Sequence, residues 1–201
     1  MARRINVKAK REPMPTIIGA GITEQWYFTH LKFLYDYQIK VRPRYFGTET
    51  ADGMAKKIAD VLADGGTAIC VFDADVSTWN DAEKKKLDKL RAKYVKNKHV
   101  LLCDSLPAVE YWFLLHYENT NRYFGTSKAT VQALRQYIPD YDKTESFLGN
   151  RKWVAKMSDE GKLEQACERA KQFGLDSPSY SRIHELFNVV NTSVKIYRAK
   201  S

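Results

Sequence analysis

Cysteine and histidine are scarce in this chain, and neither is arranged as a metal or disulfide framework. The 201 residues include three cysteines (Cys70, Cys103 and Cys167) and four histidines. The cysteines form no C-x-x-C pair and the histidines no H-E-x-x-H pair, so the sequence offers no recognisable zinc site. An odd number of widely spaced cysteines, two of them inside apolar runs, is typical of buried thiols in a reducing compartment. We therefore expect a cytoplasmic protein.

Long apolar runs and phosphate-binding loops are also missing. No stretch approaches the about 20 apolar residues that a membrane-spanning helix needs, so no membrane association is expected. The basic start, MARRINVKAKREP, has no apolar segment behind it and does not read as a secretory signal. The pattern G-x-x-x-x-G-K-[ST] does not occur, so the sequence predicts no P-loop NTPase activity.

The chain has fewer acidic than basic residues. The chain has 33 Lys plus Arg against 24 Asp plus Glu, a formal net charge of +9 and a pI near 9.3. Because each neutralised phosphate releases bound counterions, this balance favours a nucleic acid, DNA or RNA, as the partner. The alternative is a basic surface that only keeps the protein soluble.

The first half of the chain alternates apolar strands with helical patterns. We expect strands at 15–19, 37–46, 67–72 and 98–103, and helices at 24–35, with Thr23 as N-cap, 51–63, 80–94 and 107–117. This order predicts an α/β fold with a mostly parallel sheet flanked by helices. From residue 127 the patterns are helical, at 128–137, 145–156, 161–173 and 181–191. The expected organisation is a basic N-terminus (1–14), an α/β core (15–120) and a helical extension packed on it (121–201).

Acidic residues follow three of the predicted strands. Glu24 opens the first helix, Asp73 and Asp75 follow the most apolar strand, and Glu110 lies on the helix after the strand that ends at Cys103. In a parallel sheet these positions share one edge, where carboxylates can hold Mg²⁺ or Mn²⁺. Each has a structural alternative: a turn for the D-x-D pair, helix-dipole stabilisation for Glu24, and an ion pair with a neighbouring cation for Glu110.

Basic residues near the predicted strands and helices are candidates for contacts with nucleic acid. Some alternate on the second strand, some begin a lysine-rich helix, and some precede a tryptophan that could stack on an unpaired base. These candidates are Arg42, Arg44, Lys84, Lys85, Arg151 and Lys152. The alternatives are a solvated strand edge, a solvated helix face and, for Trp153, a place in the core, which is the favoured reading of that tryptophan.

Three segments resemble the RloB-like family. Residues 20–28 (AGITEQWYF) resemble its E-G-x-T-E-x-x-Y-F signature, residues 71–75 (VFDAD) its V-F-D-x-D, and residues 105–116 (SLPAVEYWFLLH) its S-N-P-x-F-E-x-W-x-L-x-H. The likeness runs from about Thr16 to Tyr117 and continues more weakly from residues 141–143 (YDK) onward.

The resemblance implies a Toprim-type, Rossmann-like fold and a metal-dependent nuclease of bacterial anti-phage defence, which a partner or regulator from the same system would control. It makes position 20, Glu24 and Glu110 the catalytic candidates, with the glutamate after the first strand as general acid/base. It makes Glu24, Asp73 and Asp75 the ligands of Mg²⁺ or Mn²⁺. It indicates neither an oligomeric state nor a choice between DNA and RNA.

The sequence departs from the family pattern at two positions. The leading glutamate of the signature is Ala20, and a methyl group neither transfers a proton nor binds a metal; Leu106 stands where the family has Asn. A naturally degenerate, non-catalytic binding or regulatory module would explain Ala20. A deliberate substitution that disables the enzyme would also explain it, and the retention of the other acidic residues favours this second explanation. Other Toprim activities, primer synthesis or strand passage, are disfavoured because no segment resembles the partner domains that they require.

Overall fold

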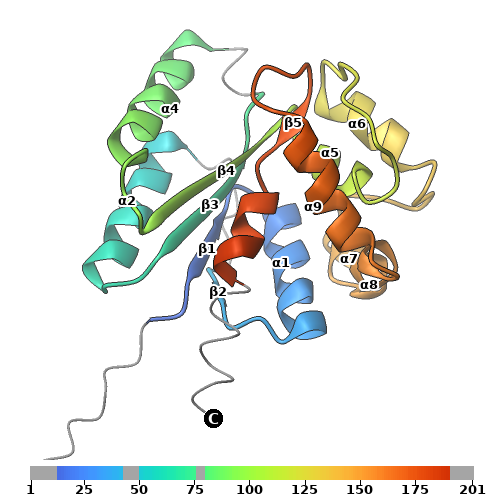
Figure 1. The fold of residues 1–201 in the computed structure, drawn as a ribbon, viewed down its shortest axis with the longest axis horizontal. Coiled ribbons are helices and arrows are strands. Elements are labelled where there is room, and N and C mark those ends of the chain that lie inside the picture. Colours follow the sequence, from blue (N-terminus) through green and yellow to red (C-terminus); the bar gives the residue numbers. More distant parts are fainter. Residues whose placement is uncertain (1–12, 43–49, 76–79, 191–201) are drawn as a thin grey trace, which may run out of the picture.

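The sheet has five strands in the order β2-β1-β3-β4-β5. The computed structural model describes residues 13–42, 50–75 and 80–190. Strands β1 (Thr16–Gly19), β2 (Lys40–Val41), β3 (Ala68–Asp73) and β4 (Val100–Leu106) are parallel, whereas β5 (Tyr180–Ser181) pairs antiparallel with β4 (Figure 1). The predicted α/β fold with a mostly parallel sheet is confirmed.

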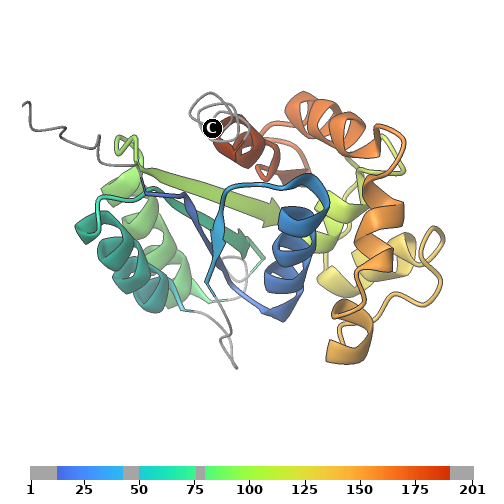
Figure 2. The same cartoon turned by 90° about the horizontal axis from the view of Figure 1, so that it is seen from below.

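Helices cover both faces of the sheet. One face carries α2 (Ala51–Ala63) and α4 (Asp81–Tyr94), and α1 (Ile22–Tyr35) covers the other (Figures 1 and 2). The remaining helices lie on the same side of the sheet as α1 (Figure 2). They are α5 (Val109–Leu114), α6 (Ser127–Leu134), α7 (Glu145–Leu148), α8 (Lys152–Ser158), α9 (Lys162–Gln172) and a helical segment at 184–190. No helix of the described residues is long and apolar enough to cross a membrane.

Alternation along the strands divides the core into two clusters. Ile18 of β1 and Cys70 of β3 pack with α2 and α4, whereas Ile17 and Ile69 pack with α1 and α5. The second, larger cluster also contains buried side chains of α6, α8 and α9. The helical extension therefore shares one hydrophobic core with the α/β part of the chain.

The element boundaries correct several expectations. The strand expected at 37–46 is a ladder of only Lys40–Val41, and residues 43–49 lie outside the described part. The helix expected at 145–156 is two helices, because α7 ends at Leu148, with Gly149 as its C-cap, and α8 begins at Lys152. Helix α5 is shorter than expected, and β4 runs on to Leu106. Strand β5 lies where a helix was expected to begin.

The start of α1 is also corrected. Its N-cap is Gly21, not Thr23, which lies inside the helix. By contrast, α2 and α4 begin with side-chain caps. The Thr50 hydroxyl accepts a hydrogen bond from Gly53 N–H, and the side-chain oxygen Oδ1 of Asn80 accepts one from Ala82 N–H. Such caps satisfy backbone donors that have no partner within the helix.

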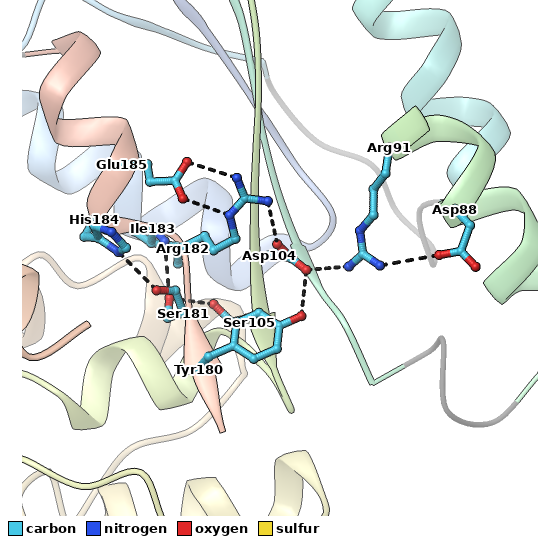
Figure 3. Close-up of polar contacts among 10 residues, drawn as sticks. All are labelled: Asp88, Arg91, Asp104, Ser105, Tyr180, Ser181, Arg182, Ile183, His184 and Glu185. Carbon is cyan, nitrogen blue, oxygen red and sulfur yellow. Dashed lines mark hydrogen bonds and ion pairs between the residues drawn. The ribbon is translucent and has the colours of Figure 1, made fainter. Parts of the chain in front are cut away.

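A buried carboxylate joins the two sides of the sheet at β4. Asp104 is 1% exposed, and its Oδ2 accepts hydrogen bonds from Arg91 of α4 and from the Tyr180 hydroxyl of β5 at 2.8 Å (Figure 3). Its Oδ1 lies 3.7 Å from Nη1 of Arg182, whose guanidinium also pairs with Glu185 at 2.8 Å. One side chain thus links α4 to the segment that carries β5.

We expect the Asp104→Asn variant to unfold more easily, by about 2–4 kcal/mol, because two arginines would lose a buried partner. Urea unfolding would measure the change. The matched control is Asp88→Asn: Asp88 pairs with the same Arg91 at 3.7 Å but is 57% exposed, so its loss should cost about 0.5 kcal/mol or less. Equal effects of the two substitutions would contradict the role given to Asp104.

Candidate active site

A cavity of about 510 Å³ lies at the carboxyl edge of the sheet, between β1 and β3. It is bounded by the turn from β1 into α1, the end of β3, the first turns of α2 and α4, and one residue of the helical extension. Its lining residues are Ala20, Gly21, Ile22, Thr23, Glu24, Thr50, Ala51, Met54, Phe72, Asp73, Glu83, Leu87, Val109 and Lys143. The sheet edge that the sequence predicted as the site is therefore hollowed.

Glu24 occupies the third position of α1 and is 3% exposed. Its carboxylate accepts hydrogen bonds from its own backbone N–H and from that of Gly21, which closes the start of the helix. Burial, together with the negative charge of Glu110, raises the pKa of Glu24 to about 7. Glu24 therefore has a structural role, and its pKa also suits proton transfer near neutral pH.

Asp73 ends β3 and holds the start of α5, the helix that follows the neighbouring strand β4. Its Oδ1 accepts a hydrogen bond from Val109 N–H at 2.8 Å, which fixes α5 against the strand end. Burial raises the pKa of Asp73 well above its ordinary value, and the charges of Glu24, Glu110 and Asp75 raise it further. Asp75 is close enough to act on Asp73 but is not among the described residues that line the cavity.

Glu110 is completely buried, and the structure supplies the cation that a buried carboxylate requires. Its Oε1 accepts hydrogen bonds from the Tyr141 hydroxyl and the Lys143 ammonium, both at 2.8 Å. Its Oε2 has no hydrogen-bond partner among the described residues. Glu110 therefore ties the extension to the site.

Lys143 is a site residue that the sequence reasoning missed. Its side chain is 46% exposed and lines the cavity that Glu24 and Asp73 also line. Burial alone would lower the pKa of Lys143, but the nearby carboxylates, Glu110 first, raise it, so the ammonium stays charged. The one sequence signal was the weak family likeness of residues 141–143.

The basic candidates are dispersed. Lys84 and Lys85 are exposed on α4, next to the lining residue Glu83, whereas Arg42 continues β2 at the sheet edge. The Arg151 guanidinium lies 5.7 Å from the ring centroid of Phe33. Phe33 is about 13 Å from Glu24 along the axis of α1, so Arg151 and the adjacent Lys152 lie away from the cavity. Arg44 lies outside the described residues. Trp153 is a core residue, as favoured, with its indole N–H donating to the carbonyl of Leu148 at 3.2 Å.

The residues present do not complete a metal site. Across 13–42, 50–75 and 80–190, no group of three or more His, Cys, Asp or Glu side chains is arranged to hold a metal ion. Three carboxylates, Glu24, Asp73 and Glu83, line the cavity, and Ala20 lines it with them. Ala20 adds no oxygen donor to these carboxylates, at the position where the family signature has glutamate.

A family model described as RloB-like protein matches residues 16–195. The chain belongs to the RloB-like family. No curated protein and no solved structure matches it. In this RloB-like chain, the three signature segments 20–28, 71–75 and 105–116 contribute to one cavity, and the match extends through the helical extension that provides Lys143.

The pKa of Glu24 predicts a pH-dependent stability. Because the folded-state pKa (about 7) exceeds the ordinary 4.5, the stability contribution is full below pH 4.5 and is lost as the pH rises toward 7. Glu24→Gln should remove this loss. The unfolding free energy of the variant, relative to that of the unsubstituted chain, should therefore rise by about 1–3 kcal/mol from pH 4.5 to pH 8. Urea unfolding at both pH values measures it. The control Glu168→Gln, 67% exposed, should show no such gain.

The ion pair between buried Glu110 and the half-buried Lys143 predicts coupling between the two side chains. Lys143→Met should destabilise the fold by about 3 kcal/mol, because the Glu110 charge would stay buried without its cation. Glu110→Gln combined with Lys143→Met should cost at least about 1 kcal/mol less than the sum of the two single changes. Chemical unfolding of all four forms measures the coupling, and additive effects would show that the pair contributes nothing.

Proposed function

We propose that this RloB-like chain is a Toprim-type, metal-dependent endonuclease of bacterial defence whose catalysis is disabled at position 20. The observation that carries the proposal is the convergence of the three signature segments on one cavity, which Glu24, Asp73 and Ala20 line together. A cavity with buried carboxylates of raised pKa is the arrangement in which proton transfer and charge stabilisation are found.

The chain's own residues divide the work of phosphodiester cleavage. Glu24, with a pKa of about 7, can hold or release a proton next to the substrate. Asp73 is fixed by the Val109 N–H, and Lys143 offers a positive charge to a phosphate at the mouth of the cavity. A divalent metal in such a site would stabilise negative charge on the phosphate. In this chain Ala20 supplies no oxygen ligand at the position where the family has glutamate.

The charge of the molecule supports nucleic acid as substrate. The net charge is +9, and Lys84 and Lys85 are exposed on the helix whose Glu83 and Leu87 line the cavity. A phosphodiester chain that reaches the carboxylates would be held by such cations. A cytoplasmic defence protein of this kind would act with a partner or regulator from the same system.

A second function is favoured by a specific observation. Ala20 and the incomplete metal donor set fit a non-catalytic module that binds nucleic acid or regulates a defence complex. Such a module would bind nucleic acid without cutting it, whatever stands at position 20.

The deciding experiment restores the missing carboxylate. Labelled DNA and total cellular RNA are incubated with Mg²⁺ or Mn²⁺ and either the native chain or Ala20→Glu. We expect cleavage by Ala20→Glu to exceed that by the native chain at least about 10²-fold, the usual contribution of a general acid/base. EDTA should abolish the cleavage.

Two variants control this experiment. Ala20→Gln matches the glutamate in size but transfers no proton, so it should stay inactive, and Ala20→Glu with Asp73→Ala should lose activity. If Ala20→Glu folds and binds nucleic acid but cuts none of it, the nuclease assignment fails and the binding module stands.

A further inference from the structure

A second cavity, of about 340 Å³, adjoins the first through one shared side chain. It lies between α6 and the segment that follows it, within the helical extension. Its lining residues are Ser127, Lys128, Val131, Arg135, Tyr141, Asp142 and Lys143. Lys143 lines both cavities, so its side chain is a wall that they share.

The two cavities differ in charge. The first contains the carboxylates Glu24, Asp73 and Glu83, whereas the second contains three cations, Lys128, Arg135 and Lys143, against one acid, Asp142. That acid is already engaged, because its Oδ1 accepts a hydrogen bond from Thr144 N–H at 3.1 Å. A hollow surface with this balance attracts an anion.

The donors of the second cavity are held in place. Arg135 donates through Nε to the Tyr141 carbonyl at 3.0 Å, which orients a guanidinium that has further donors on its terminal nitrogens. The Lys143 ammonium lies 2.8 Å from Glu110 Oε1 and 3.4 Å from Ser127 Oγ. An arginine, two lysines and a hydroxyl are the groups that proteins use for phosphate.

We propose that this second cavity binds a phosphate of the nucleic-acid strand whose neighbouring nucleotide enters the carboxylate cavity. The inference rests on the proposed function for the class of ligand, a nucleic acid, and adds the place where the backbone of one strand binds. The phosphate is either an internal diester or a terminal monoester, since both offer the same oxygens to Lys128, Arg135 and Lys143.

The test uses binding, not cleavage. The native chain, in EDTA, is titrated into fluorescein-labelled 12-nucleotide single strands of DNA and RNA, and anisotropy gives Kd at several salt concentrations. Lys128→Ala should weaken binding roughly fivefold and lower the slope of log Kd against log salt by about 0.7, the value for one phosphate contact on a single strand. Lys128 is exposed, so its loss should leave the fold intact.

Lys156→Ala is the matched control, because Lys156 is exposed on α8 of the same extension and lines neither cavity. It should change neither Kd nor the salt slope. Strands that end in a 5′-phosphate, a 3′-phosphate or only hydroxyls distinguish the two sources of the phosphate: equal affinity indicates an internal diester, and preference for one phosphorylated end indicates a monoester.

The outcomes separate this inference from the nuclease assignment. If Lys128→Ala binds as tightly as the native chain, or if the native chain binds no strand at all, the phosphate site is overturned, whether or not Ala20→Glu cleaves. If Lys128→Ala weakens binding with the lowered salt slope while Ala20→Glu cuts nothing, the phosphate site stands and the nuclease assignment falls.

Discussion

The burial of several carboxylates at one edge of the sheet is the constraint on which the rest of this structure depends. Burial, together with the charges of neighbouring carboxylates that include Glu110, raises the pKa values of Glu24 and Asp73. Such a group is costly to fold unless it binds protons or a cation. Lys143 is the cation that the chain itself provides, at 2.8 Å from Glu110, and Tyr141 adds a hydrogen bond to the same oxygen.

This constraint explains why the helical extension is integral to the site. The segment that carries Tyr141 and Lys143 packs into the same core cluster as α1 and α5, so the neutralising charge is positioned by hydrophobic contacts. A similar solution recurs at β4, where buried Asp104 receives Arg91 from one side of the sheet and Tyr180 with Arg182 from the other. In both places, residues of the helical extension bind one oxygen of a buried acid in the α/β part.

Local patterns were sufficient to predict the part of the site that comes from strand ends. The apolar run of β3 predicted a buried strand, and its end placed Asp73 at the edge of a parallel sheet, where the structure has it. Glu24 followed from the helix start, although the cap itself is Gly21, because the Glu24 carboxylate turns back to the backbone. Lys143 and β5 were not predictable in this way: one is an isolated cation in a loop, and the other is two residues long, so neither carries a periodicity.

Glu110 belongs to the α/β part of the chain, but its partners Tyr141 and Lys143 belong to the helical extension. This limits which segments of the chain can be transferred to another protein. A segment ending near residue 120 would keep the acidic residues and lose both the ammonium group and the aromatic surface that covers α5. For protein engineering, the smallest transferable unit therefore includes the extension. Exchange of specificity between members of the family would have to graft whole chains, or graft the 127–143 segment together with the helix that carries its acidic partner.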